Sequence, residues 1–149
     1  MSAAAVVRAS RSAQLELADA VAGHQGGWEE AGVAWQAERF DQPLAAFHAP
    51  SHQGAVGREF SMLKVSHPSV AVKAVKMAEK GDEVVVRVLN MSPKSVKGAR
   101  LSLAGDIASA REVTGAEDDK GAAKVVDSHL AFDMKPYEPK SFALRLRNA

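Results

Sequence analysis

Apolar and polar residues alternate over much of the second half of the chain, which is the pattern of β-strands with one buried face. In residues 84–89 (VVVRVL) valine occupies every position of one face. Residues 70–77 (VAVKAVKM) precede this segment, and Lys-Gly-Asp at 80–82 lies between the two. Glycine tolerates the positive φ that a tight turn requires. The pattern therefore predicts a β-hairpin at the centre of the fold.

The first strand of this hairpin contains an irregularity. Lys73 and Lys76 have opposite parity, so they cannot both face water in a regular strand. One extra residue near Ala74–Val75 would return Val75 and Met77 to the core side. We therefore predict a β-bulge at this point.

Further strands are expected on both sides of the hairpin. Three strands fall within residues 60–90, and later ones are expected at 95–103, 107–113, 130–134 and 142–146. Glu117 to Gly121 (EDDKG) is interpreted as a solvated loop, because its acids lack the spacing of a calcium-binding EF-hand. Short strands separated by turn residues indicate a mainly β fold, an antiparallel β-sandwich of about seven strands over residues 59–149.

A different pattern occupies residues 14–58. Apolar and small residues recur at helical spacing over about 28–40, with Gly32 in the interior, and Pro43 follows. Because glycine disfavours a helix interior, we expect another group to pack closely against Gly32. Short strands are predicted at 14–21 and 44–48. Residues 1–13 are expected to be disordered or a truncated terminus, with a transit peptide as the alternative.

Composition limits the classes of function. The chain has 149 residues, of which 46% are apolar and 5% aromatic, so Val, Leu, Ala and Met must build the core. A net charge of +1 predicts neither nucleic acid nor a membrane surface as a partner. Cysteine is absent, which excludes disulfides and thiolate metal sites and favours a cytoplasmic location. The apolar run at residues 3–7 is too short to span a membrane.

No catalytic constellation is present in the sequence. His48 and His52 come closest to the spacing of a zinc site, but they lie in a loop rich in Pro, Ser and Gly, so loop residues are the preferred interpretation. The motifs GxSxG, GxGxxG and the P-loop are missing. Trp28 and Trp35 suggest either a sugar-stacking platform or a packing stripe, and their spacing of seven favours the stripe. We therefore assign no catalytic, metal or cofactor-binding residue.

Three blocks of the sequence occur in a distinctive order. They are HQGGWEEAGVAWQAERFDQPL from His24, the hairpin region from Phe60 to Asn90, and FDMKPYEPKSFALRL from Phe132. In this order they resemble the C-terminal part of α-mannosidases of glycoside hydrolase family 38, over roughly residues 15–147. Two positions depart from that family's pattern: Gly27 stands where an aspartate is usual, and Gln42 replaces an asparagine.

The resemblance implies a parent enzyme that hydrolyses terminal α-mannosides. Its aspartate nucleophile, acid/base carboxyl and zinc ion belong to an N-terminal catalytic domain, and no residue of this chain matches them. The chain is therefore expected to need no cofactor and to pack against that catalytic domain through Trp28, Trp35, Phe40 and Phe47, with weak self-association through the same surface. The alternative is a free-standing β-sandwich that binds carbohydrate or protein.

Overall fold

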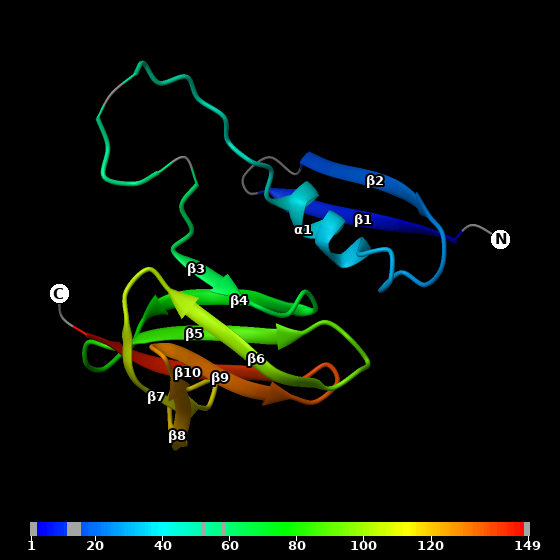
Figure 1. The fold of residues 1–149 in the computed structure, drawn as a ribbon. Helices are drawn as coiled ribbons and strands as arrows, with labels where there is room; N and C mark the ends of the chain where they lie inside the picture. The colour runs from blue at the N-terminus through cyan, green and yellow to red at the C-terminus, as the bar shows by residue number, and fades with distance from the viewer. Residues whose placement is uncertain (1–2, 12–15, 52, 58, 148–149) are drawn as a thin grey trace. The chain divides into compact units, whose positions relative to one another are not determined.

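The computed structural model describes residues 3–11, 16–51, 53–57 and 59–147. The chain divides into two compact units, Met1–Gln53 and Gly54–Ala149 (Figure 1). The sequence places the corresponding boundary between residues 58 and 59, inside the irregular segment that opens the second unit. Each unit has its own secondary structure and is described separately.

The first unit contains a two-stranded antiparallel ribbon and the helix. Strand β1 (Ala3–Arg11) pairs with β2 (Glu16–His24) in an unbroken register. Helix α1 (Val33–Asp41) contacts β1. The sequence pattern anticipates β2, whereas β1 lies in the segment 1–13 that was expected to be disordered or truncated. A run of small residues and arginines has no clear apolar face, which is why the pattern does not indicate this strand.

Helix α1 is shorter than the sequence predicts. Residues 28–32 form turns instead of the first helical turns, and α1 begins at Val33. Gly32 is the residue before the helix, with a left-handed φ of 64°, and the space around it is open. The expectation of tight packing against a glycine in the helix interior is therefore wrong; the glycine serves the backbone conformation. The strand predicted at 44–48 is also absent, and Leu44 is fully exposed.

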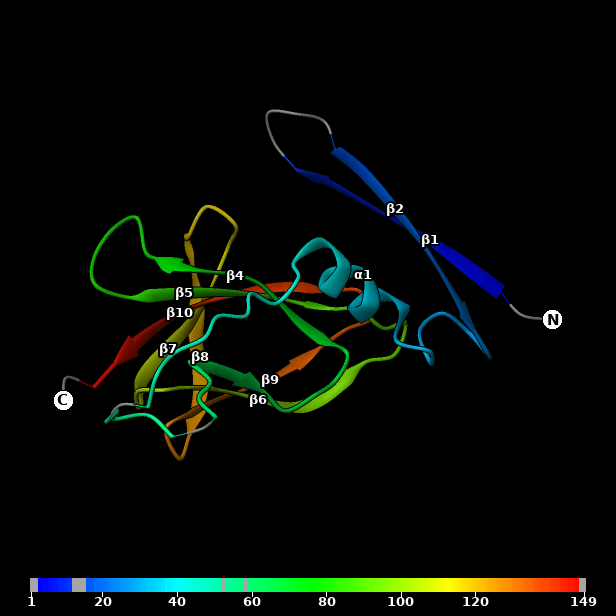
Figure 2. The same ribbon diagram turned by 90° about the horizontal axis from the view of Figure 1, so that it is seen from above.

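The second unit is an antiparallel β-sandwich, as the sequence predicts. Its strands are β3 (Leu63–Val65), β4 (Val70–Met77), β5 (Val84–Asn90), β6 (Val96–Leu103), β7 (Ile107–Val113), β8 (Asp119–Val126), β9 (His129–Met134) and β10 (Pro139–Leu146). They form one sheet in the order β3-β6-β9-β8-β7-β10-β5-β4, which folds back on itself as two layers (Figure 2). This unit thus has eight strands, compared with about seven predicted.

The additional strand, β8, connects the two layers. Its first half pairs with β7, where Ala123 lies opposite Ala110, and its second half pairs with β9, where Val125 lies opposite Leu130. The segment 117–121, predicted to be a loop, overlaps the start of this strand. Small and charged residues give β8 no alternation of large apolar side chains, so the sequence pattern does not indicate it.

The core lies between the inner faces of the two layers. Phe132 on β9 and Phe142 on β10 face one another there, with ring centroids 5.1 Å apart. The other fully or almost fully buried members are aliphatic or Met, as the low aromatic content predicts: Val70, Val86, Val88, Val96, Ala99, Leu101, Ile107, Leu130, Met134 and Leu144. The alternating residues of the predicted strands therefore build the core.

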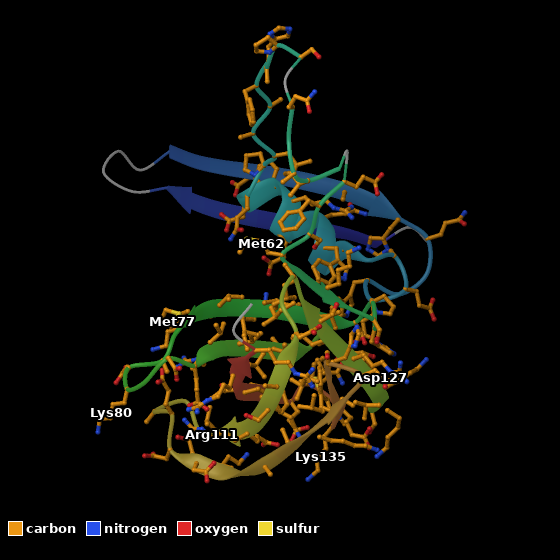
Figure 3. The ribbon with its side chains drawn as sticks, turned by 60° about the vertical axis from the view of Figure 1, so that its left-hand side comes forward. Met62, Met77, Lys80, Arg111, Asp127 and Lys135 are labelled. Atoms are coloured by element: carbon orange, nitrogen blue, oxygen red, sulfur yellow. The ribbon has the colours of Figure 1, made fainter. Side chains whose placement is uncertain are left out.

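The predicted bulge in β4 is present. Val72 lies opposite Val88 and Ala74 lies opposite Arg87, so Lys73 is the extra residue. Beyond it, Val75 and Met77 lie opposite core-facing residues of β5, as predicted. Both side chains nevertheless remain more than half exposed, because β4 is the last strand of the sheet. Met77 lies at the turn end of the hairpin, near Lys80 (Figure 3).

Candidate functional site

The outer face of the layer β4-β5-β10-β7 is also partly buried. Arg111, Ala143, Val85 and Lys76 lie side by side across the four strands. Val85 and Ala143 have no exposed surface, and Val113 on the neighbouring row is 3% exposed. The valine run at 84–86 is the sequence signal for this second buried face, because a strand covered on both sides is apolar without interruption.

Two ion pairs lie at the ends of this row. Arg111 on β7 (Figure 3) donates from Nη2 to Oε2 of Glu83 at 2.7 Å, and its Nε donates to the same carboxylate. Lys76 Nζ lies 2.6 Å from Oε1 of Glu117. The hydrogen bond to Glu83 raises the pKa of Arg111, and the hydrogen bond to Glu117 raises that of Lys76. Each of these acids therefore has a basic partner on a neighbouring strand.

The loop after β7 is tied to the hairpin β4–β5. Oε2 of Glu117 accepts a hydrogen bond from the backbone N–H of Glu79 at 2.8 Å, and Arg87 Nη2 donates to the carbonyl of Gly115 at 2.7 Å. Glu117 has a positive φ of 68°, a conformation that side chains of this kind rarely adopt. The hydrogen bond from Lys76 is the largest influence that lowers the Glu117 pKa, followed by the Glu79 N–H.

A groove of about 520 Å³ is bordered by this loop and by β4, β5, β8 and β10. Val113 and Leu89 supply part of its apolar lining. Its lining also includes four basic residues and no acidic one: Lys73, Arg87, Lys120 and Lys140. These residues come from four different strands, so the sequence gives no local motif for the groove.

One carboxylate next to the groove balances part of this charge. Glu112 on β7 forms ion pairs with Lys120 and with Lys140, the latter at 3.3 Å. Burial by itself would raise the pKa of Glu112, but the two lysines outweigh this effect and lower it. One negative charge is thus shared by two of the four basic residues. Basic residues therefore outnumber this acid at the groove, whose lining also includes Lys73 and Arg87.

The four residues predicted to pack against another domain all lie in the first unit. Trp28, Trp35 and Phe40 are 47%, 37% and 38% exposed, and Phe47 is 87% exposed. Trp28 belongs to the turns before α1, Trp35 and Phe40 to the helix, and Phe47 to the irregular segment after it. The structure thus leaves large apolar side chains accessible at each of these positions.

The histidines do not form a metal centre in the described part of the chain. His48 is exposed, whereas His52 lies outside the described residues. His67 uses Nδ1 to contact Ser69 Oγ at 2.8 Å in the turn before β4, a local structural role. Among the described residues, no group of three or more His, Cys, Asp or Glu side chains is placed to hold a metal ion. The described residues therefore do not fit the zinc that the family resemblance implies for a parent enzyme.

The second unit thus defines a class, an antiparallel β-sandwich domain with a groove whose lining includes four basic residues. Residues 69–142, about half of the chain, match the family described as glycosyl hydrolases family 38 C-terminal beta sandwich domain. This part of the chain belongs to that family. The matched segment begins just before β4 and ends within β10. No curated protein matches the chain.

The description of the family places the domain at the C-terminal end of a glycosyl hydrolase. The expected family is therefore confirmed for the β-sandwich. Within the described residues, no helix has the length and apolar character needed to cross a membrane.

Proposed function

We propose that this chain is the C-terminal β-sandwich part of an α-mannosidase-like glycoside hydrolase and that it serves as a packing domain for the catalytic part. The match of residues 69–142 to a domain family of such hydrolases is the observation that carries the proposal. The nucleophile, the acid/base carboxyl and the zinc of such an enzyme would then belong to the catalytic part. A cytoplasmic location, favoured by the absence of cysteine, is included in the proposal.

The chemistry of the sandwich surface supports a structural role. The partly buried acids of the sandwich hold basic side chains: Glu83 pairs with Arg111, Glu112 with Lys120 and Lys140, and Glu117 with Lys76. A general acid in a glycosidase has its pKa raised so that it keeps a proton near neutral pH. The pKa values of Glu112 and Glu117 are lowered, which suits ion pairing.

The proposed contact surface lies in the first unit. Large apolar side chains that remain accessible are typical of a surface that another polypeptide covers. Trp28 and Phe47 are exposed at 47% and 87%, and Trp35 and Phe40 accompany them. We propose that these four side chains pack against an apolar patch of the catalytic part. When that part is absent, the same surface would support weak self-association, which sedimentation at high protein concentration would detect.

A binding experiment tests the packing role. The chain is mixed with the separately expressed catalytic part of a family 38 α-mannosidase, and complex formation is followed by sedimentation. We expect a stable complex that the double variant Trp28→Ser, Phe47→Ser weakens by roughly tenfold or more, because such anchors dominate interface energies. Phe60→Ser is the matched control, since Phe60 is 60% exposed but lies in the second unit.

Two results would contradict this proposal. One is the absence of a complex at high concentration. The other is hydrolysis of an aryl α-mannoside by the chain by itself.

The groove favours a second candidate, a free-standing carbohydrate-binding module. Its volume of about 520 Å³ falls in the range of small-molecule sites. Calorimetric titration with mannose and with manno-oligosaccharides distinguishes the two candidates. Saturable heat would support the binding module, whereas no heat is expected from a packing domain.

A further inference from the structure

We propose that the groove between the 114–118 loop and strands β4, β5, β8 and β10 binds a small ligand that carries an oxyanion, a phosphate or carboxylate group, next to an apolar portion. The proposal concerns a separate surface from the packing residues of the first unit. It therefore does not depend on the proposed packing role.

The first argument is the charge of the lining. Four basic residues contribute to the groove, and the acid that contacts two of them, Glu112, is not part of the lining. The other two basic residues are Lys73, the bulge residue of β4, and Arg87 on β5, so the basic residues of the lining outnumber this acid. A bulge re-aims the side chain of the extra residue, and here the lysine is at the edge of the groove. Clefts lined by one sign of charge concentrate ions of the opposite sign.

The second argument is the state of the Arg87 guanidinium. A guanidinium has five N–H donors, and one of them is used at the carbonyl of Gly115. Among the described residues, Arg87 Nε is buried without a hydrogen-bond acceptor. Buried donors of this kind normally have a partner, and a charged donor without one is costly. The hydrogen bond to the loop thus fixes the orientation of the guanidinium, and its remaining N–H donors can bind an anionic acceptor. Arginine recognises phosphate and carboxylate groups through such N–H donors.

The third argument is the rest of the lining. Val113 and Leu89 provide apolar surface, whereas the residues Thr114 and Ser141 carry hydroxyl groups. A mostly apolar site with a few polar and charged groups is typical of small-molecule sites. The volume of about 520 Å³ exceeds that of a bare phosphate ion, so a ligand larger than the ion is expected.

Nearby acids set the strength of the site. Glu117 lies close enough to Arg87 for the guanidinium to contribute to the lowering of the Glu117 pKa. The Glu117 carboxylate therefore competes with an anionic ligand for the positive charge of Arg87. Glu112 similarly reduces the contribution of Lys120 and Lys140. We therefore expect weak binding of a bare anion, with a dissociation constant on the order of 1 mM, and tighter binding when an apolar portion is added.

The test is an NMR titration of the ¹⁵N-labelled full chain. Sodium phosphate and sodium acetate are added in separate series at constant ionic strength, and the amides of Gly115 and Ser141 serve as reporters. Saturable shifts with phosphate alone would identify a phosphate site, and saturable shifts with acetate would extend it to carboxylates. Mannose 6-phosphate is then compared with phosphate and with mannose, and we expect it to bind more tightly than either.

Variants locate the response in the groove. Lys73→Gln should weaken phosphate binding roughly threefold or more, the effect of one exposed charge. Arg87→Lys keeps the charge but removes the forked donor, and it should weaken binding further. Lys80→Gln is the matched control, because Lys80 is also an exposed lysine of the β4–β5 hairpin but lies in its turn, outside the groove (Figure 3). Each variant is first checked for a native ¹H–¹⁵N spectrum.

Two features of the chemical shift changes decide the test: whether they saturate, and which residues show them. Shifts that grow linearly without saturation would overturn the proposal, and so would saturable shifts confined to residues far from the groove. Equal weakening by Lys73→Gln and Lys80→Gln would also overturn it, because the response would then reflect net charge alone.

Discussion

Asn90 is a buried polar residue among apolar neighbours at the end of β5, with no exposed surface. Its Nδ2 donates to the carbonyls of Lys94 and Lys135, both at 2.8 Å, and its Oδ1 accepts from the backbone N–H of Ser92. The side chain thus joins the turns that follow β5 and β9. Because backbone groups buried without partners are costly, this one amide holds two connections in place.

We predict that Asn90→Ala destabilises the sandwich by about 2–4 kcal/mol, since it leaves three backbone groups without their partner. Urea denaturation followed by far-UV circular dichroism measures the change. Tryptophan fluorescence is unsuitable, because both tryptophans lie in the first unit. Ser92→Ala is the control, with an expected effect within about 0.5 kcal/mol, since Ser92 Oγ accepts only an exposed bond from Lys94 N–H. Equal effects of the two variants would contradict the role of the amide.

Glu117 makes the stability of the sandwich depend on pH. Its pKa is lowered in the folded state from the ordinary value of 4.5, chiefly by the hydrogen bond from Lys76. Because the folded state then binds fewer protons than the unfolded state, the stabilisation is fully present above pH 4.5 and is lost as the pH falls through the folded-state pKa.

Glu117→Gln should therefore be less stable than the natural sequence at pH 7, and the difference should shrink as the pH falls below 4.5. Thermal unfolding of the two proteins at several pH values measures this difference. Glu79→Gln is the matched control, because Glu79 lies 3.6 Å from the same lysine but its side chain is 76% exposed. The control should differ little from the natural sequence at any pH. A stability difference between Glu117→Gln and the natural sequence that stays constant down to low pH would contradict the assignment of this pH dependence to the Glu117 carboxylate.

At the scale of elements, alternation predicted strands in which one face is uniformly apolar. It located β5, β9 and β10, and the parity of Lys73 and Lys76 correctly indicated a bulge. Alternation failed for β8, which changes layers and carries small residues, so neither of its faces is uniformly apolar. Local pattern therefore predicts a strand only where that strand keeps one buried face throughout.

The basic groove could not be predicted for a related reason. Its basic residues lie on β4, β5, β8 and β10, and only the register of the sheet brings them together. The contacts of Asn90 with Lys135 span 45 residues in the same way. Sequence spacing carries no information about such neighbours until the strand order is known. The valine run at 84–86 was the available signal for the second buried face, and it was interpreted as ordinary alternation.

The bulge in β4 makes a deletion at Lys73 tolerable. Val72 and Ala74 already lie opposite consecutive residues of β5, so removing Lys73 gives a regular ladder with every other side chain on its present face. We predict a native-like spectrum and a change in unfolding free energy within about 1 kcal/mol for this deletion. Chemical denaturation and a ¹H–¹⁵N spectrum measure both quantities.

Deletion of Ala71 is the matched comparison. No bulge exists at that position, so the deletion turns Val70, which is 3% exposed, away from the core. The expected loss is about 1.5–3 kcal/mol, the contribution of one buried valine. If the two deletions destabilise the protein equally, the bulge does not set the register of β4.

At the scale of the whole molecule, the matched family segment and the folded unit have different limits. The match begins at residue 69, whereas the second unit begins at Gly54 and includes β3. β3 pairs with β6 through Leu63, Lys64 and Val65, and its two apolar side chains pack against the core. The sheet therefore requires a strand that lies before the matched segment.

We predict that residues 54–149 fold without the first unit, because the core and all eight strands of the sandwich lie within them. The amide signals of Val86, Leu101 and Leu130 should coincide with those of the full chain. A shorter fragment, residues 66–149, lacks β3 and should be less stable than residues 54–149 by about 2–4 kcal/mol. The fragment loses the partly buried Leu63 and Val65, and β6 becomes an exposed edge strand. Urea denaturation of both fragments measures this difference. Equal stability would mean that β3 is dispensable and that the family segment by itself defines the folded domain.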